Sequence, residues 1–215
     1  MPAREMPISS VLRDASRRQH EQAENSPFIV QLMSGELDLG SYAAYLTQLA
    51  WLYHELEKHT TMGVAFESSD QLWSPHLLRS AAIDHDLRAL GVSDWQSTTA
   101  VTPAMSRYCD HIATLGDRSD FRLIAHHYTR YLGDLSGGQA IARLVARHYG
   151  ATAEQLTFYS FEGIPEPVRF KEAYRDSLDS LPLSDEELSE LVTEVQLAFS
   201  FNQSVFDDLA RGVIH

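Results

Sequence analysis

Three side chains near the N-terminus have types and a spacing that could hold a bound ion. His20 and Glu24 are four residues apart, and Arg13 lies seven residues before His20. In a helix all three would project from about the same face. An imidazole that binds a metal needs its second nitrogen fixed by a carboxylate or carbonyl, which Glu24 could supply. The alternative is a solvated charged face, because most of the 10 histidines in such a chain are not ligands.

A second unusual feature is the segment HHYTRYLGDLSGGQ at residues 126–139, which contains Gly133, Gly137 and Gly138. Apolar residues recur at spacings of three and four over residues 121–149, so an amphipathic helix is predicted there, with Gly150 as its stop signal. Each glycine inside a helix costs about 1 kcal/mol relative to alanine, so the three together cost about 3 kcal/mol. Some other interaction must offset this cost.

Gly133 and Gly137 stack on one face of that helix, where the missing side chains let another body reach the backbone. That body could be a second helix packed against small residues, or a flat ligand. A phosphate-binding loop fits poorly, because Gln139 and Ala140 follow the last glycine in place of Lys and Ser or Thr. Helix packing and ligand binding both remain open at this point.

The elements that would position these residues are helices. Alternating patterns of strand length are hard to find, and no repeat or Pro-rich linker is present. We therefore predict an all-α fold of about eight or nine helices in a single domain of residues 1–215, with residues 1–8 and 212–215 as flexible ends. The helix-start signals are Ser26-Pro27, Ser74-Pro75, Thr102-Pro103 and the capping box of Ser184 with Glu187.

Composition limits the classes of function. The net charge of −13 argues against a surface for nucleic acids or anionic membranes, both of which need clustered Lys and Arg. A lone cysteine, Cys109, forms no internal disulfide, and the start MPAREMPISS lacks the apolar run of a signal peptide. No apolar stretch is long enough to span a membrane. We expect a cytoplasmic protein without a membrane anchor.

Helix-local metal motifs are absent, but a second basic cluster is present. No Glu or Asp is followed three residues later by His, as a di-iron bundle requires, and His20-Glu21 has no second His at position 24. Lys171 and Arg175 are four apart on one helical face and would suit a dianionic ligand. Ordinary surface pairing with Glu172 and Asp176 is the alternative.

Five segments, spread in order over nearly the whole chain, resemble the heme oxygenases, and the short bacterial members most closely. The resemblance implies one helical domain that holds heme between a proximal helix, with His20 as the axial iron ligand, and a kinked distal helix with Gly133 and Gly137. The segments are QHEQAE at 19–24, HHYTRYLGDLSGGQ at 126–139, FYSFEGI at 158–164, FKEAYR at 170–175 and FSFNQSVF at 199–206.

The same resemblance implies further site residues. Glu24 would steady His20, and Gly138 would belong to the glycine wall that contacts heme. Phe199 and Phe206 would line the pocket. The heme propionates would be held by Arg13, Tyr128, Lys171 and Arg175.

On the distal side, the resemblance implies that Asp134 anchors water and delivers protons through it, with Tyr53, Arg130 and Asn202 completing the polar network. The sequence departs from its bacterial relatives at Glu166, where those relatives can offer a Lys near the propionates. Arg169 is the candidate substitute.

The activity implied is the conversion of heme, O2 and reducing equivalents to biliverdin, CO and free iron, with iron acquisition as its purpose. Heme would be both substrate and cofactor. The chain has no dinucleotide fingerprint, so electrons would come from a separate reductase or ferredoxin. A monomer is expected. The alternative from another class is a non-catalytic heme-binding or storage protein, which would have no use for Asp134 beside the glycines.

Overall fold

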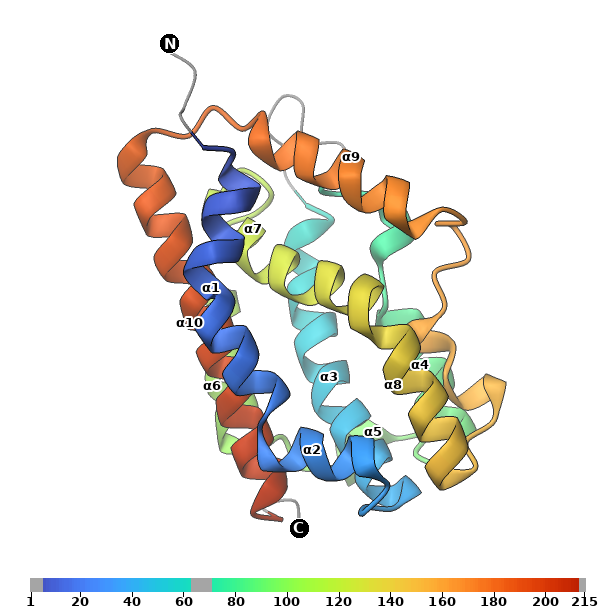
Figure 1. Cartoon of the computed structure of the whole chain (residues 1–215). Helices are drawn as coiled ribbons and strands as arrows, with labels where there is room; N and C mark the ends of the chain where they lie inside the picture. The colour runs from blue at the N-terminus through green and yellow to red at the C-terminus, as the bar shows by residue number, and fades with distance from the viewer. Residues whose placement is uncertain (1–5, 63–70, 213–215) are drawn as a thin grey trace.

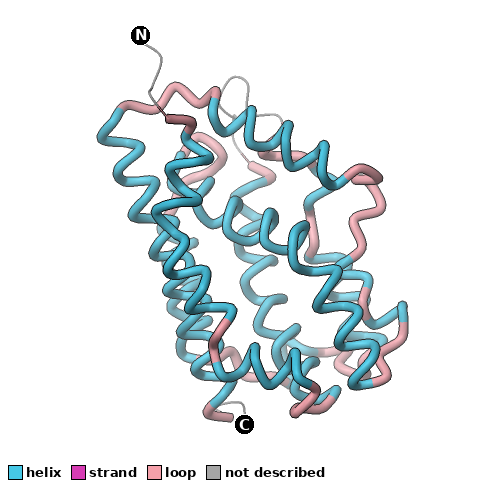
Figure 2. The backbone as a smooth tube through the Cα atoms, viewed as in Figure 1, coloured by secondary structure: helices cyan, strands magenta, loops and turns pink. Residues whose placement is uncertain are grey.

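The computed structural model describes residues 6–62 and 71–212, and this part of the chain is helices and loops without a strand (Figures 1 and 2). The predicted all-α fold is confirmed. Its helices are α1 (Ile8–Glu24), α2 (Pro27–Ser34), α3 (Leu39–Thr60), α4 (Ser80–Ala89), α5 (Trp95–Thr98), α6 (Pro103–Thr114), α7 (Phe121–His127), α8 (Gly133–Tyr149), α9 (Pro167–Asp179) and α10 (Asp185–Ala210). Three 3₁₀ turns, η1 (Pro75–Leu77), η3 (Ala153–Gln155) and η4 (Thr157–Tyr159), and one π-helical segment, η2 (Tyr128–Leu132), complete the list.

The helices pack around a core to which α3 contributes most heavily. α1 lies along α10, α7 and α6 pack on α10, and α3 packs on α4 and α6. Thirteen residues of α3 are buried, which is why its apolar pattern covers more than one face. In Figure 1, α1 and α10 form one side of the molecule, α8 forms the other, and α9 crosses the end near the N-terminus.

Most helix starts follow the capping signals. Thr102 Oγ1 accepts a hydrogen bond of 3.2 Å from the Met105 N–H at the start of α6. Ser184 and Glu187 form the reciprocal capping box that opens α10. The Ser74-Pro75 signal starts only the short turn η1, and the helix α4 begins five residues after that proline, at Ser80.

The glycine-bearing segment is one long distal helix made of α7, η2 and α8. The π-helical segment interrupts it just before Gly133, and the helix changes direction along its course (Figure 1). Gly150 ends it with φ 70°, the left-handed conformation that favours glycine. The predicted helix and its stop signal are therefore confirmed, and the kink has a structural cause in the π segment.

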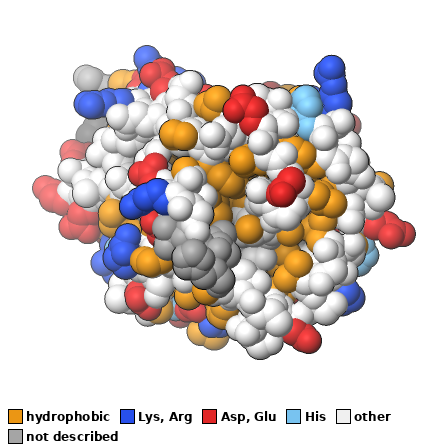
Figure 3. All heavy atoms as spheres, turned by 90° about the horizontal axis from the view of Figure 1, so that it is seen from below, with side chains coloured by type: hydrophobic (Ala, Val, Ile, Leu, Met, Phe, Trp, Pro, Cys, Tyr) orange, Lys and Arg blue, Asp and Glu red, His pale blue; other side chains and the backbone are white. Residues whose placement is uncertain are grey.

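The expected flexible ends at 1–5 and 213–215 lie outside the described residues, but Ile8 does not behave as an end. It begins α1 and is 1% exposed, and the next residue, Ser9, donates two hydrogen bonds to Asp179 at the end of α9. Seen from the end that carries α2, hydrophobic side chains gather near the middle of the face and charged ones spread around it (Figure 3). No helix in the described ranges has the length and hydropathy needed to cross a membrane.

Candidate functional site

A cavity of about 700 Å³ opens between α1 and the distal helix. This volume is in the range of clefts that hold a cofactor-sized molecule. One wall is α1 and the other is the segment from η2 into α8, and single side chains from α9 and α10 complete the lining. The lining residues are Ser9, Arg13, Ser16, Arg17, His20, Glu21, Glu24, Tyr128, Thr129, Leu132, Gly133, Ser136, Arg175 and Phe199.

The α1 wall carries the imidazole that the sequence singled out. His20 is 54% exposed in the structure, and its Nδ1 lies 3.6 Å from Glu24 Oε2. Its ring meets Phe199 of α10 edge to face, with 5.7 Å between centroids. The carboxylate and the aromatic ring together limit how the imidazole can turn. A ring nitrogen is thus available to a metal centre in the cavity.

The opposite wall includes Gly133, and Gly137 one turn later also faces open space. A Cβ built on Gly133 or Gly137 meets no described atom within 4 Å. Helix packing is therefore the wrong explanation for these two glycines, because no helix of the described chain lies against them. Gly138 differs: its Cβ would lie 2.8 Å from Cδ1 of Tyr159. Gly138 packs against Tyr159, and neither Gly137 nor Gly138 is among the residues that line the cavity. Their contact with the ligand stays a prediction.

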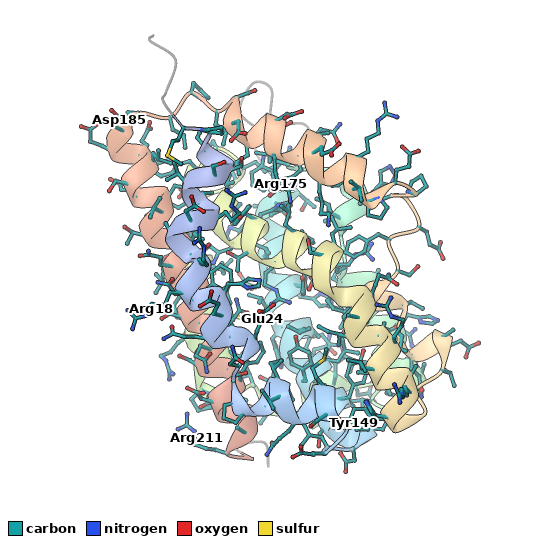
Figure 4. The ribbon with its side chains drawn as sticks, viewed as in Figure 1. Arg18, Glu24, Tyr149, Arg175, Asp185 and Arg211 are labelled. Atoms are coloured by element: carbon teal, nitrogen blue, oxygen red, sulfur yellow. The ribbon has the colours of Figure 1, made fainter. Side chains whose placement is uncertain are left out.

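Positive charge lies at one end of the cavity. Arg13 of α1 and Arg175 of α9 both line it, and Figure 4 shows Arg175 at the α9 end and Glu24 near the other end of α1. Burial raises the pKa of the Tyr128 phenol, while the charges of Arg175 and Arg13 act in the opposite direction. Lys171 Nζ donates to Ser136 Oγ at 3.2 Å and so reaches the rim. These groups could bind carboxylates.

Two expected residues lie elsewhere. Arg169 is 84% exposed and faces Glu166 with 3.5 Å between Nη1 and Oε2, so it does not replace the missing lysine in the cavity lining. Phe206 is buried against Phe28 and Tyr45, with ring centroids 6.5 Å and 6.0 Å away. It belongs to the core beside α2 and is not among the residues that line the cavity.

The four residues of the expected distal network are in direct contact. The Tyr53 hydroxyl donates to Asp134, and Arg130 Nη2 donates to Asp134 Oδ1 at 3.3 Å. Arg130 Nη1 donates to Asn202 Oδ1 at 3.1 Å. Burial raises the pKa of the Asp134 carboxyl, although Arg130 and Tyr53 oppose the shift. A carboxyl shifted upward in this way is better suited to proton transfer near neutral pH.

Buried polar atoms without a partner indicate room for a ligand or water next to this network. Thr129 Oγ1 and Arg130 Nε are buried and make no hydrogen bond in the described structure. Thr129 also lines the cavity. Buried donors and acceptors are usually satisfied, by water where no protein group is available. The wall next to the glycines is therefore suited to ordered water.

Sequence reasoning missed the outer part of this polar region. Glu57 accepts hydrogen bonds from the Tyr131 hydroxyl at 3.1 Å, from the Arg79 backbone N–H and from Ser80. The Arg79 guanidinium donates to the carbonyls of Phe158 and Ser160. No sequence motif predicts this set, because its members come from α3, α4, η2 and the 158–160 segment. Ser136 was also missed, although it lies three residues after Gly133 on the same face.

The comparisons with known proteins agree with this geometry. The Heme oxygenase family model matches residues 6–208. A heme oxygenase of Pyropia yezoensis is 32% identical over 203 residues, covering 94% of this chain and 85% of that protein.

Solved structures give the same result. Heme oxygenase-2 from Synechocystis sp. PCC 6803, in complex with heme and NO, superimposes with a TM-score of 0.89 at 32% identity, covering 97% of this chain and 87% of that one. The heme oxygenase from Leptospira interrogans gives 0.88 at 31% identity, covering 94% of this chain and all of that one. The residues present fit the ligand that this family takes, with an imidazole on one wall and open glycine backbone on the other. The chain belongs to the heme oxygenase family.

Proposed function

We propose that the chain is a heme oxygenase that binds heme between α1 and the distal helix and converts it, with O2 and reducing equivalents, to biliverdin, CO and free iron. One observation carries this proposal. His20 stands on one wall of the 700 Å³ cavity, Gly133 lies in the opposite wall, and a Cβ on Gly133 or on Gly137 one turn later would meet open space. A flat macrocycle with one axial histidine needs both features.

The basic end of the cavity would set the orientation of the substrate. Arg13 and Arg175 would bind the two propionate carboxylates, with the Tyr128 hydroxyl and Lys171 in support. Holding both carboxylates at one end fixes which edge of the macrocycle lies deepest. The position of these cations would therefore decide which bridge carbon is oxidised.

The network on the distal side would handle protons. Asp134 would hold a water molecule and pass a proton through it, while Arg130, Tyr53 and Asn202 keep the carboxyl in place. The glycine backbone brings no acidic side chain directly against the reacting oxygen. Heme supplies the iron that binds O2. A neutral imidazole pushes less electron density onto iron than a thiolate does, and so favours O–O cleavage less.

Electrons would come from a separate reductase or ferredoxin, because the sequence has no G-x-G-x-x-G fingerprint of its own. We place the enzyme in the cytoplasm as a monomer, where its purpose would be to recover iron from heme. The lone cysteine and the acidic composition support this setting.

An optical experiment tests the proposal. Purified protein is mixed with one equivalent of hemin, a reductant is added under air, and the Soret and red regions are followed. Loss of the Soret band with growth of biliverdin absorption is the expected result. A Soret band that forms and then survives these conditions would contradict the proposal and favour a heme carrier.

A further inference from the structure

Two imidazoles outside the cavity converge on one carboxylate oxygen. His126 Nε2 lies 2.8 Å from Glu194 Oε1, and His111 Nε2 contacts the same oxygen. The three side chains come from α7, α10 and α6, on the side of α10 that packs against α6 and α7. One donor atom from each residue lies within 4.8 Å of the other two. None of the three lines the heme cavity.

The surroundings fix the buried imidazole for ligation. His126 is fully buried, and its Nδ1 lies 3.2 Å from the Tyr108 hydroxyl. In the tautomer with its proton on Nδ1, His126 can donate to Tyr108 and leave Nε2 free for a metal. Such a hydrogen bond to the second nitrogen is what orients ligating histidines in proteins.

The donor types and their access also fit a cation. Glu194 offers a carboxylate oxygen, and His111 and His126 each offer a ring nitrogen. The His111 side chain is 26% exposed, which leaves one edge open to an ion and a water ligand.

A comparison within the chain shows what is special about this cluster. His54 Nε2 also faces a carboxylate, 3.0 Å from Asp84 Oδ1, but the Trp95 indole N–H donates to that same oxygen at 3.0 Å. An indole N–H cannot ligate a metal. At Glu194 both groups on the shared oxygen are imidazoles, so both can become ligands.

We propose that His111, His126 and Glu194 form a binding site for a divalent transition-metal ion, with the ligand set that suits Zn²⁺. Two imidazoles and one carboxylate are a recurrent protein set for Zn²⁺, with water in the fourth position. Binding would move each imidazole from the carboxylate oxygen to the ion, with ligand distances of about 2.0–2.2 Å. This site is separate from heme and goes beyond the proposed heme oxygenase function.

The test uses the untagged full chain, free of heme and treated with a chelator, in a His20→Ala background so that the cavity imidazole cannot contribute. Zn²⁺ affinity is measured by competition with a chromophoric chelator, and Co²⁺ serves as a spectroscopic probe. We expect one Zn²⁺ per chain and visible Co²⁺ absorption typical of four or five ligands. His111→Ala should weaken Zn²⁺ binding by far more than about tenfold, and Tyr108→Phe by about tenfold.

His54→Ala is the matched control, because it removes an imidazole that faces a single carboxylate, and it should leave Zn²⁺ affinity unchanged. Glu194→Gln keeps the shape of the side chain and should also abolish the Co²⁺ spectrum. Circular dichroism on each variant establishes that it is folded. Absence of Zn²⁺ binding, or equal affinity in His111→Ala and its parent, would overturn the proposal and leave a hydrogen-bonded triad.

Discussion

The ring of Tyr159 lies directly against Gly138, where any Cβ would come within 2.8 Å of Cδ1. Gly133 and Gly137, which are five residues and one residue before Gly138, differ from it because they face open space. The three glycines therefore have two different structural roles. Gly138 permits a close internal contact, whereas Gly133 in the cavity wall and Gly137 leave open space beside the helix.

This difference predicts opposite effects of alanine on the heme-free protein. Gly133 has a helical φ of −59°, so Gly133→Ala and Gly137→Ala should each stabilise the fold by about 0.5–1 kcal/mol through helix propensity. Gly138→Ala should destabilise it, because the Tyr159 ring must shift. Urea unfolding measures both. The same two stabilising variants should lose heme turnover, and a destabilised Gly137→Ala would contradict the open-wall assignment.

His20→Ala should remove the axial ligand and abolish biliverdin formation, while heme still enters the cavity because the cations at its end remain. Added imidazole should restore the Soret spectrum and part of the turnover, since it can occupy the space that the side chain leaves. His85→Ala is the matched control, because His85 is 50% exposed and lies outside the cavity, whereas His20 is 54% exposed. Unchanged turnover in His20→Ala would show that another group binds the iron.

Asp134→Asn should keep the shape of the distal network but remove its titratable group. We expect biliverdin yield to fall by about 10²–10⁴-fold, the usual contribution of a positioned acid or base. Turnover should be diverted to peroxidase-type oxidation of an added phenol. Tyr53→Phe, which removes one partner of that carboxyl, should give a smaller loss. A normal biliverdin yield from Asp134→Asn would refute a proton-delivery role.

Arg175→Ala should weaken the hold on one propionate and so produce a mixture of biliverdin isomers, which chromatography of the product separates. Loss of one charge-assisted hydrogen bond would cost about 1.5–3 kcal/mol in heme binding. Arg169→Ala should change neither quantity, because Arg169 faces Glu166 at the surface. Equal effects of the two substitutions would mean that Arg175 attracts the propionates only by its positive charge and makes no specific hydrogen bond to them.

His127 predicts a specific acid sensitivity. Burial lowers the pKa of its imidazole from 6.5 to about 3. The unfolded chain therefore takes up a proton at this residue below about pH 6.5 while the native chain does not, so stability falls as the pH drops from 6.5 to about 3. The contribution is at most one proton, or about 1.4 kcal/mol per pH unit. His127→Gln should reduce the slope of unfolding free energy against pH by that amount, and an unchanged slope would contradict the prediction.

The sequence predicts correctly those helix ends that depend on residues close together in the chain. The capping residues Thr102 and Ser184 and the glycine stop at position 150 are local signals, and each acts as expected. Gly138 shows the limit of such reasoning. Its neighbour Tyr159 is 21 residues away, and no spacing rule connects them.

The same limit explains the missed clusters. The spacing rules for metal ligands apply within one helix, whereas His111, His126 and Glu194 come from three. Glu57, Arg79 and Tyr131 likewise meet only after α3, α4 and the distal helix have packed. An aromatic side chain such as that of Phe206 suits a ligand pocket and a protein core equally well. Only the position of α2 shows that it lies in the core beside Phe28.

The π-helical segment at Tyr128–Leu132 affects how α8 is rotated about the helix axis relative to α7. A turn with i→i+5 bonding accommodates one more residue than an α turn, and one residue corresponds to about 100° of rotation. The direction in which the glycine face of α8 points is therefore independent of the direction in which α7 buries His126 and His127. Restoring regular α-helical bonding through this segment would rotate the glycine face of α8 away from His20 without changing any side chain of the site.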